Sequence, residues 1–285
     1  LAIELLPDGK VRRLHKQRIY VKLAEDGIGE IGEGAFERGI NALKTFKEIV
    51  MTFSKAPISR DIAREMSDLF NQLFLEGGAE KLPPIKALAL YYEYRELTPL
   101  GDKGDQMIRN LADRLIKVDL LEQAAQLLDH QVNFRLKGAQ KSLTGSKLAV
   151  VHLWNGNPKE SLDILSKTRW RALPDKVKDE RRYIQARAFL ELDQYTDALD
   201  LLDGDKSKKA RLMRADIYWK SKNWKQVIGA LDGILQENGA NKAATLSEID
   251  RQRIMQVAVA RSLAGDQKGL EDMRDKYRGK IVNTP

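Results

Sequence analysis

The sequence predicts an all-α protein, a superhelical solenoid of antiparallel helix pairs. Two observations carry this prediction: small and large residues recur at a fixed spacing, and short turn-forming segments divide each recurrence in two. Composition agrees, because 42% hydrophobic and 32% charged residues with 20 glycines and 8 prolines in 285 residues favour helices over a many-stranded β protein.

The repeat begins with a small residue, followed by a large one three positions later, a bulky one at nine, a small one at twelve and a large apolar one at sixteen. Small side chains allow two helices to cross closely, and large ones fill the space beside the crossing, so each copy predicts an αα-hairpin. The copies are Ala112, Leu115, Leu121, Ala124, Leu128; Ala149, His152, Pro158, Ser161, Leu165; Ala186, Phe189, Tyr195, Ala198, Leu202; Ala215, Tyr218, Trp224, Val227, Leu231; and a degraded Ala258, Arg261, Gln267, Leu270, Arg274.

Turns are expected inside each pair, at residues 117–120, 155–158, 193–194, 221–223 and 265–266. The dipeptides Asp203-Gly204 and Asn238-Gly239 are expected to end helices, because glycine accepts the left-handed conformation that follows a helix. Thr245 with Glu248 has the spacing of a capping box and is expected to open the last pair.

Three regions are expected along the chain. Residues 1–56 form an N-terminal segment of uncertain structure, in which Ile19-Tyr20-Val21 favours a hairpin or an extended segment. Residues 57–101 contain two amphipathic helices, at 57–77 and 84–97, that we expect to form an atypical capping pair. Residues 102–285 form the repeat array. Because the chain begins with Leu1, we expect it to be a piece of a longer protein.

At these residues the chain resembles the tetratricopeptide repeat (TPR) family, over residues 102–278 and best at residues 182–205. Pro158, Gln267, Arg261 and Arg274 depart from the family's pattern, and the repeat lengths are uneven. The resemblance implies a right-handed superhelix that binds peptides or proteins on its concave face, here as a fragment of a larger bacterial TPR-containing protein. The family's chaperone-binding clamp of Lys, Asn and Arg is not reproduced.

The family register also selects candidate partner-binding residues, since certain positions of each pair face the groove. These are Trp154, Tyr183, Arg187, Lys209, Trp219 and Lys220. Rings bury area at low entropic cost and cations pair with carboxylates, so we expect an extended or helical ligand with acidic and apolar side chains. The other interpretation is that Trp154 and Trp219 pack between neighbouring pairs.

An alternative function is nucleic-acid binding through the basic C-terminal third. The chain carries 49 basic and 41 acidic residues, a net charge of +8, and residues 205–285 carry 17 and 10 of them. A basic run there could follow phosphates, with Trp219 and Trp224 as stacking surfaces: Lys206, Lys208, Lys209, Arg211, Arg214, Lys220, Lys222 and Lys225. Trp224 holds a packing position, however, and +7 is modest for a nucleic-acid domain, so this function ranks second.

Catalysis has little support in the sequence. Residues 27–32 spell GIGEIG, a literal GxGxxG, and residues 31–36 resemble the glycine loop of protein kinases, but no βαβ unit and no further kinase motif follows. The histidines are His15, His130 and His152, without metal-ligand spacing, and cysteine is absent. We therefore expect a protein that is not an enzyme and has no cofactor or metal.

No stretch approaches the roughly 18 consecutive apolar residues that a membrane span requires. We expect a soluble protein, and the sequence does not distinguish bacterial cytoplasm from periplasm.

Overall fold

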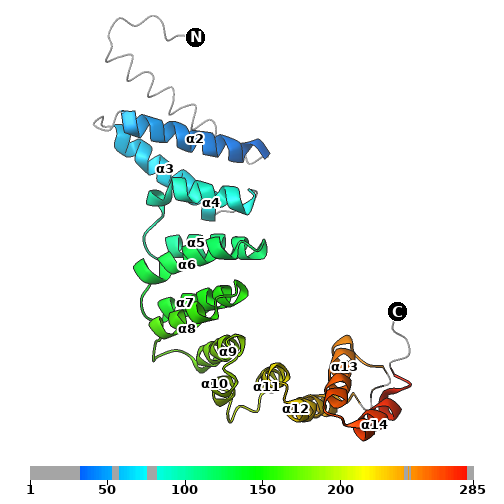
Figure 1. Ribbon diagram of the computed structural model, residues 1–285. Coiled ribbons are helices and arrows are strands. Elements are labelled where there is room, and N and C mark those ends of the chain that lie inside the picture. Colours follow the sequence, from blue (N-terminus) through cyan, green and yellow to red (C-terminus); the bar gives the residue numbers. More distant parts are fainter. Residues whose placement is uncertain (1–32, 53–57, 76–81, 241–242, 244, 281–285) are drawn as a thin grey trace, which may run out of the picture. The chain divides into compact units, whose positions relative to one another are not determined.

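The computed structural model describes residues 33–52, 58–75, 82–240, 243 and 245–280, and all the regular elements in these residues are helical (Figure 1). The all-α prediction is confirmed. The chain divides into two compact units, residues 1–136 and 137–285, which are described separately below. The strand-like Ile19-Tyr20-Val21 and the glycine-rich residues 27–32 lie outside the described residues.

The first unit contains two helix pairs with a short helix between them. Its elements are α2 (Glu33–Thr52), α3 (Ile58–Leu75), α4 (Pro84–Glu93), the 3-10 helix η2 (Arg95–Leu97), α5 (Asp102–Lys117) and α6 (Leu121–Phe134). Helix α2 packs against α3, α5 packs against α6, and α4 packs against α5. The buried side chains of Phe46, Phe70 and Tyr94 belong to its core.

The expected capping pair within residues 57–101 differs from the structure. Both of its helices are present, but α3 takes α2 as its partner, and α4 packs on α5. The physical reason is that α2, a helix not predicted from the sequence, carries its own apolar face, on which Leu43 and Phe46 are fully buried.

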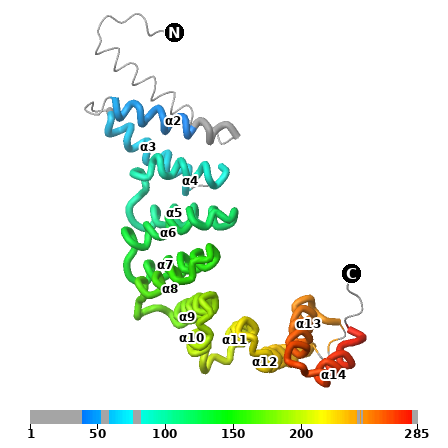
Figure 2. Tube along the Cα trace, viewed as in Figure 1, coloured from blue at the N-terminus to red at the C-terminus, as the bar shows by residue number. Residues whose placement is uncertain are grey.

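The second unit is a succession of helix pairs (Figure 2). Its helices are α7 (Gly138–Trp154), α8 (Pro158–Lys167), α9 (Asp175–Glu191), α10 (Tyr195–Asp200), α11 (Lys208–Lys220), α12 (Trp224–Glu237), α13 (Glu248–Leu263) and α14 (Gln267–Tyr277). Each odd-numbered helix packs against the next even-numbered one, and neighbouring pairs meet through α8 and α9, α10 and α11, and α12 and α13. This order of contacts is the stacking that the repeat predicts.

The same turn joins the helices of all five repeat copies, including the degraded fifth. A residue in the left-handed conformation follows the first helix in each: Asp119 (φ 62°), Gly156 (73°), Asp193 (59°), Lys222 (59°) and Gly265 (70°). The amide of the next residue then donates a hydrogen bond to a carbonyl in the last turn of the helix. Gln194 N donates to Phe189 O at 2.9 Å, and Asp266 N donates to Arg261 O at 2.9 Å. This pattern is a Schellman motif, and it confirms the predicted turns.

The small residues of the repeat occupy the close crossings. Ala112, Ala149 and Ala186 on the first helices are fully buried, as are Ala124 and Ala198 on the second. The fifth pair departs from this pattern: Ala258 is half-buried, whereas Val257 and Ala260 in the same helix are fully buried.

Arg261 in the fifth pair stands where the third and fourth pairs have an aromatic ring. Its guanidinium donates to Asp232, at 2.6 Å, and to Asp266. The two carboxylates neutralise the cation, which explains how a charged residue is accommodated at a packing position.

The N-cap of the last pair lies two residues later than expected. Ser247, rather than Thr245, is the N-cap of α13: its Oγ accepts from Asp250 N at 3.1 Å and donates to the Asp250 carboxylate at 2.7 Å. Asn238 donates to the same carboxylate at 2.7 Å, so a contact from the end of α12 determines where α13 begins. The predicted glycine stops are confirmed, since Gly204 and Gly239 have φ of 71° and 68°.

Candidate partner-binding site

The first helices of three consecutive pairs, α9, α11 and α13, together with α12, surround a pocket of about 320 Å³, here named the inner pocket. It brings together three of the six predicted partner-binding residues, Arg187, Trp219 and Lys220. Apolar side chains from α9, α11 and α12 line it, and α13 contributes Gln256. These three residues therefore share the lining of one pocket.

The charges around the inner pocket are already paired. Arg187 lies 3.2 Å from Glu191 and 3.6 Å from Asp216. Lys220 lies 3.3 Å from Glu191 and 3.5 Å from Asp193, and it also donates to the carbonyl of Leu190 at 3.0 Å. Because each cation has carboxylate partners within the chain, these two residues offer little net attraction to an acidic ligand.

Trp219 both packs against the core and lines the inner pocket. Its ring meets that of Trp224 edge-on, with centroids 5.4 Å apart and an interplanar angle of 82°. The half-buried ring packs against the core formed by α11 to α14 and also lines the inner pocket. Trp224 is also half-buried and packs against the same core, so only part of its ring surface is exposed.

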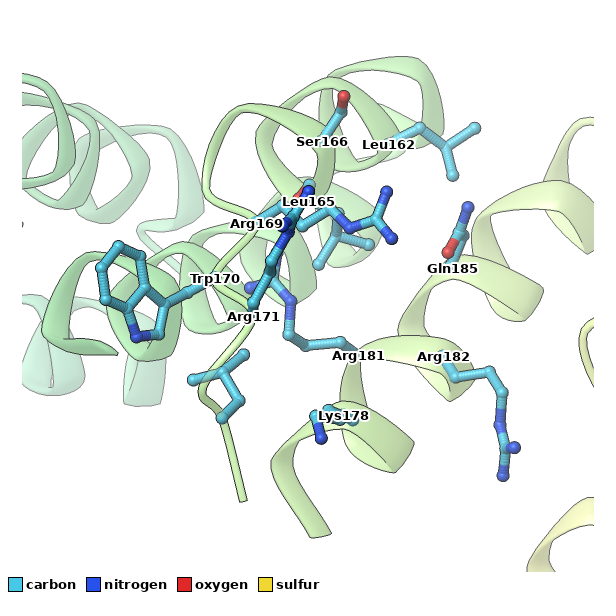
Figure 3. Close-up of a pocket in the computed structure, with 11 residues that line it drawn as sticks. Leu162, Leu165, Ser166, Arg169, Trp170, Arg171, Lys178, Arg181, Arg182 and Gln185 are labelled. Carbon is cyan, nitrogen blue, oxygen red and sulfur yellow. The ribbon is translucent and has the colours of Figure 1, made fainter. Parts of the chain in front are cut away.

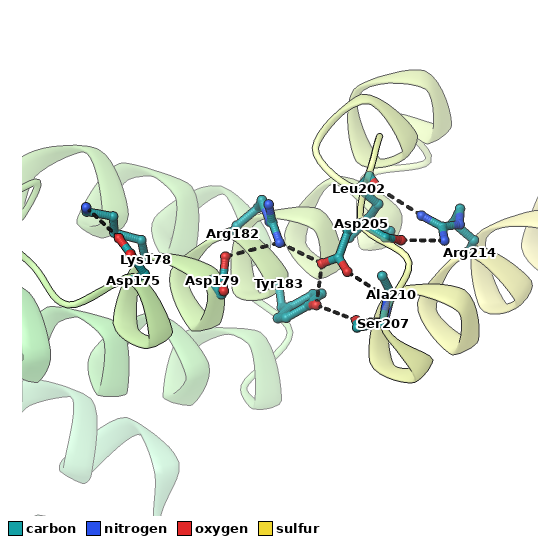
Figure 4. A network of polar contacts seen from close by, with 10 residues as sticks. All are labelled: Asp175, Lys178, Asp179, Arg182, Tyr183, Leu202, Asp205, Ser207, Ala210 and Arg214. Carbon is teal, nitrogen blue, oxygen red and sulfur yellow. Dashed lines mark hydrogen bonds and ion pairs between the residues drawn. The ribbon is translucent and has the colours of Figure 1, made fainter.

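Tyr183 was expected to contact a partner, but the residue is buried in the structure. Its hydroxyl donates to Asp205 at 2.6 Å and lies 3.0 Å from the Ser207 hydroxyl (Figure 4). Ser207 is the N-cap of α11 and accepts from Ala210 N at 3.1 Å. Tyr183 thus holds the start of α11 against α9, and Lys209, with Nζ 4.2 Å from the ring centroid, covers it from solvent.

Because the Asp205 carboxylate lies at the centre of this network, we expect the free energy of unfolding to fall at acid pH. Hydrogen bonds from Tyr183 and the Ser207 amide, with Arg182 at 2.6 Å, lower the pKa of Asp205 from its ordinary 3.8 to about 2. A depressed folded-state pKa stabilises the fold above pH 3.8, and this contribution is lost as pH falls through 2. Asp205→Asn should therefore cost about 1–2 kcal/mol near neutral pH.

Urea unfolding of both proteins at a series of pH values measures this effect. The stability gap between wild type and Asp205→Asn should shrink steadily below pH 4 and approach its minimum near pH 2. A gap that stays constant over this range would mean that the Asp205 charge does not stabilise the network.

Trp154 stands apart from the other predicted residues. It is the last residue of α7, its ring is 63% exposed, and it does not line the inner pocket. The inner pocket therefore does not join Trp154 to Arg187, Trp219 and Lys220.

Helix α13 carries an exposed apolar row that was not predicted from the sequence. Met255, Val259 and Leu263 are 57%, 43% and 56% exposed, and their four-residue spacing places them along one side of the helix. We name this row the α13 stripe. The repeat pattern contained a signal for this row. Met255, Val259 and Leu263 occupy in the fifth copy the repeat positions that Leu212, Asp216 and Lys220 occupy in the fourth, counted from Ala258 and Ala215. Those three residues of the fourth copy line the inner pocket.

The basic run of the C-terminal third is largely engaged within the chain. Arg211 pairs with Glu237, Arg214 donates to the carbonyls of Leu202 and Asp205 at 2.8 and 2.7 Å, and Lys208 donates to Asn238 at 2.8 Å. These contacts hold structural elements together and leave few cations of the run for phosphates.

Metal ligands and membrane-spanning helices are both missing from the described residues. In that part of the chain, no group of three or more His, Cys, Asp or Glu is arranged to hold a metal ion. No described helix has the length and apolar character needed to cross a bilayer.

The paired helices, their common turn and the buried small residues at the crossings define a TPR-like helical repeat protein. No protein-family model matches the chain, and no curated protein matches it. Among solved structures, it is similar to a tetratricopeptide repeat protein from Parabacteroides merdae, at 11% identity and a TM-score of 0.41, over 92% of this chain and 99% of that one.

Proposed function

We propose that this chain is a non-enzymatic interaction scaffold that binds a peptide or protein partner at the inner pocket and the α13 stripe. The observation that carries the proposal is the α13 stripe, because Met255, Val259 and Leu263 expose a continuous apolar row that the described part of the chain does not cover. An exposed apolar row beside a pocket is typical of a protein interaction surface.

The contacts around the pocket refine the expected ligand. Since Arg187 and Lys220 already pair with carboxylates, binding energy at this surface should come from apolar contact rather than from acidic groups. A partner helix with apolar side chains at positions i, i+4 and i+8 would match the spacing of the stripe.

Nucleic-acid binding is the second candidate and has weaker support. Lys206, Lys222 and Lys225 of the basic run are exposed, but Trp224, an expected stacking ring, is half-buried and packs against the core. Tight binding of oligonucleotides with a steep salt dependence would favour this alternative.

Selection from a displayed library of random peptides tests the proposed function, because it finds ligands by their affinity for the chain. Peptides selected on the wild-type chain should bind Val259→Arg at least about 10-fold more weakly, because a charge in the stripe would be desolvated by an apolar ligand. The matched control is Val118→Arg, at a similarly exposed valine that follows α5 in the other unit, and it should leave the affinity unchanged.

Circular dichroism melting of both variants should show wild-type stability, since both valines are exposed. Selected peptides that bind Val259→Arg and Trp219→Ala as tightly as wild type would refute this surface as the binding site.

A further inference from the structure

A second pocket, of about 530 Å³, lies between α8 and α9 beside the loop that joins them (Figure 3). Five basic side chains line it, and none of the described residues that line it carries a carboxylate. The five are Arg169 and Arg171 from the loop and Lys178, Arg181 and Arg182 from α9. We name it the basic pocket.

Three of these five cations have no carboxylate partner among the described residues. Arg181 donates to the carbonyls of Ser142 and Leu165 at 2.7 and 2.6 Å and to two hydroxyls, all of them neutral groups. The side chains of Arg169 and Arg171 are exposed and make no hydrogen bond or ion pair within that part of the chain. The pocket therefore keeps a net positive charge, although burial lowers the pKa of the Arg181 guanidinium.

The two remaining cations form ion pairs with carboxylates that do not line the pocket. Lys178 pairs with Asp175 at 2.9 Å, and Arg182 pairs with Asp205 at 2.6 Å and with Asp179 at 3.2 Å. The uncompensated charge is thus concentrated at Arg181 and at the two loop arginines, Arg169 and Arg171.

Apolar surface adjoins the charge. Leu165 and Leu173 contribute buried side chains to the wall, and the Trp170 ring remains 47% exposed. A Cβ added at Gly138 would lie 3.7 Å from the Trp170 ring, so the ring rests against the start of α7. Figure 3 shows Trp170 and Gln185 at opposite sides of the pocket, with arginine side chains between them.

The basic pocket exists because α9 lacks the apolar residues that would close it. In the first copy, Ile108 lies four residues before the small residue Ala112, and Leu111 lies one residue before it. Both are buried. The same positions of the third copy are Arg182 and Gln185. Long polar side chains replace these apolar ones, and a charged hollow remains between the helices.

We propose that the basic pocket binds an acidic peptide segment in which carboxylates flank an aromatic or aliphatic side chain. Guanidinium groups bind carboxylates through paired hydrogen bonds, and Trp170 with the leucine wall accepts the apolar side chain. This proposal rests on the proposed function of protein binding but assigns the acidic ligand to a surface separate from the inner pocket. A peptide fits better than a nucleic acid, since the free cations gather in one hollow beside a single exposed ring rather than along a track.

Fluorescence anisotropy with a labelled peptide tests the assignment. The probe is Gly-Glu-Asp-Phe-Glu-Asp-Gly, and its control carries Gln and Asn in place of the acids. Wild-type chain should bind the acidic peptide and not the amide peptide. The double variant Arg169→Gln, Arg171→Gln should weaken binding about 10-fold or more, with an unchanged melting curve because neither side chain has a partner among the described residues.

The matched control is Lys225→Gln, Lys268→Gln, which removes the same charge from exposed sites outside the pocket. It should change the affinity less than about 2-fold. Equal losses in the two double variants would overturn the proposal, because they would indicate attraction to net charge alone. Equal binding of the amide peptide, or displacement of the probe by a single-stranded oligonucleotide at lower concentration than by unlabelled peptide, would also overturn it.

The variant Val259→Arg separates this test from that of the proposed function. It should leave the acidic peptide's affinity at the wild-type value, since the α13 stripe does not line the basic pocket. A parallel loss in Val259→Arg would assign the acidic peptide to the inner-pocket surface and overturn the assignment to the basic pocket.

Discussion

Gly145→Ala is expected to destabilise the chain by about 2 kcal/mol, although alanine is the better helix former. Gly145 lies in α7 where the end of α8 approaches it, and an added Cβ would lie 2.7 Å from Cβ and Cγ2 of Thr168. Thr168 cannot move away easily: it is 2% exposed, and its hydroxyl donates to Ile164 O at 2.6 Å while accepting from Arg181 at 3.1 Å. The overpacking therefore outweighs the gain in helix propensity.

The control for this prediction is the same substitution at Gly229 in α12. A Cβ there would meet no atom within 4 Å, so Gly229→Ala should stabilise the chain by up to about 1 kcal/mol. Urea unfolding of both variants measures the difference, and their opposite signs exclude a general effect of alanine. Equal stabilisation of the two variants would contradict the close approach of α7 and α8.

Arg181→Ala is expected to cost about 3 kcal/mol or more. Its guanidinium joins three helices, since it contacts Ser142 and Ser146 in α7, Leu165 in α8 and Thr168 just beyond α8. Removing it would leave the carbonyl of Leu165 near the end of α8 without this donor. The loss would loosen α9 from the preceding pair and so open the basic pocket.

Arg187→Ala is the matched control, because Arg187 lies in the same helix and is 48% exposed. Its ion pairs are on the surface and should contribute less than about 1 kcal/mol. Urea unfolding and hydrogen exchange of α8 and α9 amides distinguish the two variants. If Arg181→Ala unfolds at the same urea concentration as Arg187→Ala, the interhelical contacts of Arg181 contribute no more than surface pairs.

The local structure of the repeat followed from its residues. Small residues such as Ala186 and Ala198 mark the crossings, and a left-handed residue ends each first helix, so pattern and turn chemistry suffice to divide the chain into pairs. The degraded fifth copy has the same turn at Gly265, although Arg261 stands at the position that an aromatic ring occupies in the third and fourth copies. Interactions within a few residues are readable from sequence because the helix itself determines their geometry.

The site could be predicted only in part, because contacts between distant residues decide which groups are available. Tyr183 and Asp205 are 22 residues apart, and their hydrogen bond turns an expected ligand-binding ring into a core residue. Lys220 and Glu191 are 29 residues apart, and their pairing neutralises an expected docking cation. The sequence pattern does not predict these side-chain contacts, because they depend on how one helix pair is rotated relative to the next.

The sequence by itself determined the helix pairs of the repeat and the turns within them. Only the tertiary structure decided that α2 partners α3, that the α13 stripe lies exposed, and that Arg169 and Arg171 stand beside a hollow without carboxylates. The physical reason is that helix formation and turn chemistry are local. Burial, charge pairing and cavities depend instead on side chains that packing brings together from separate helices.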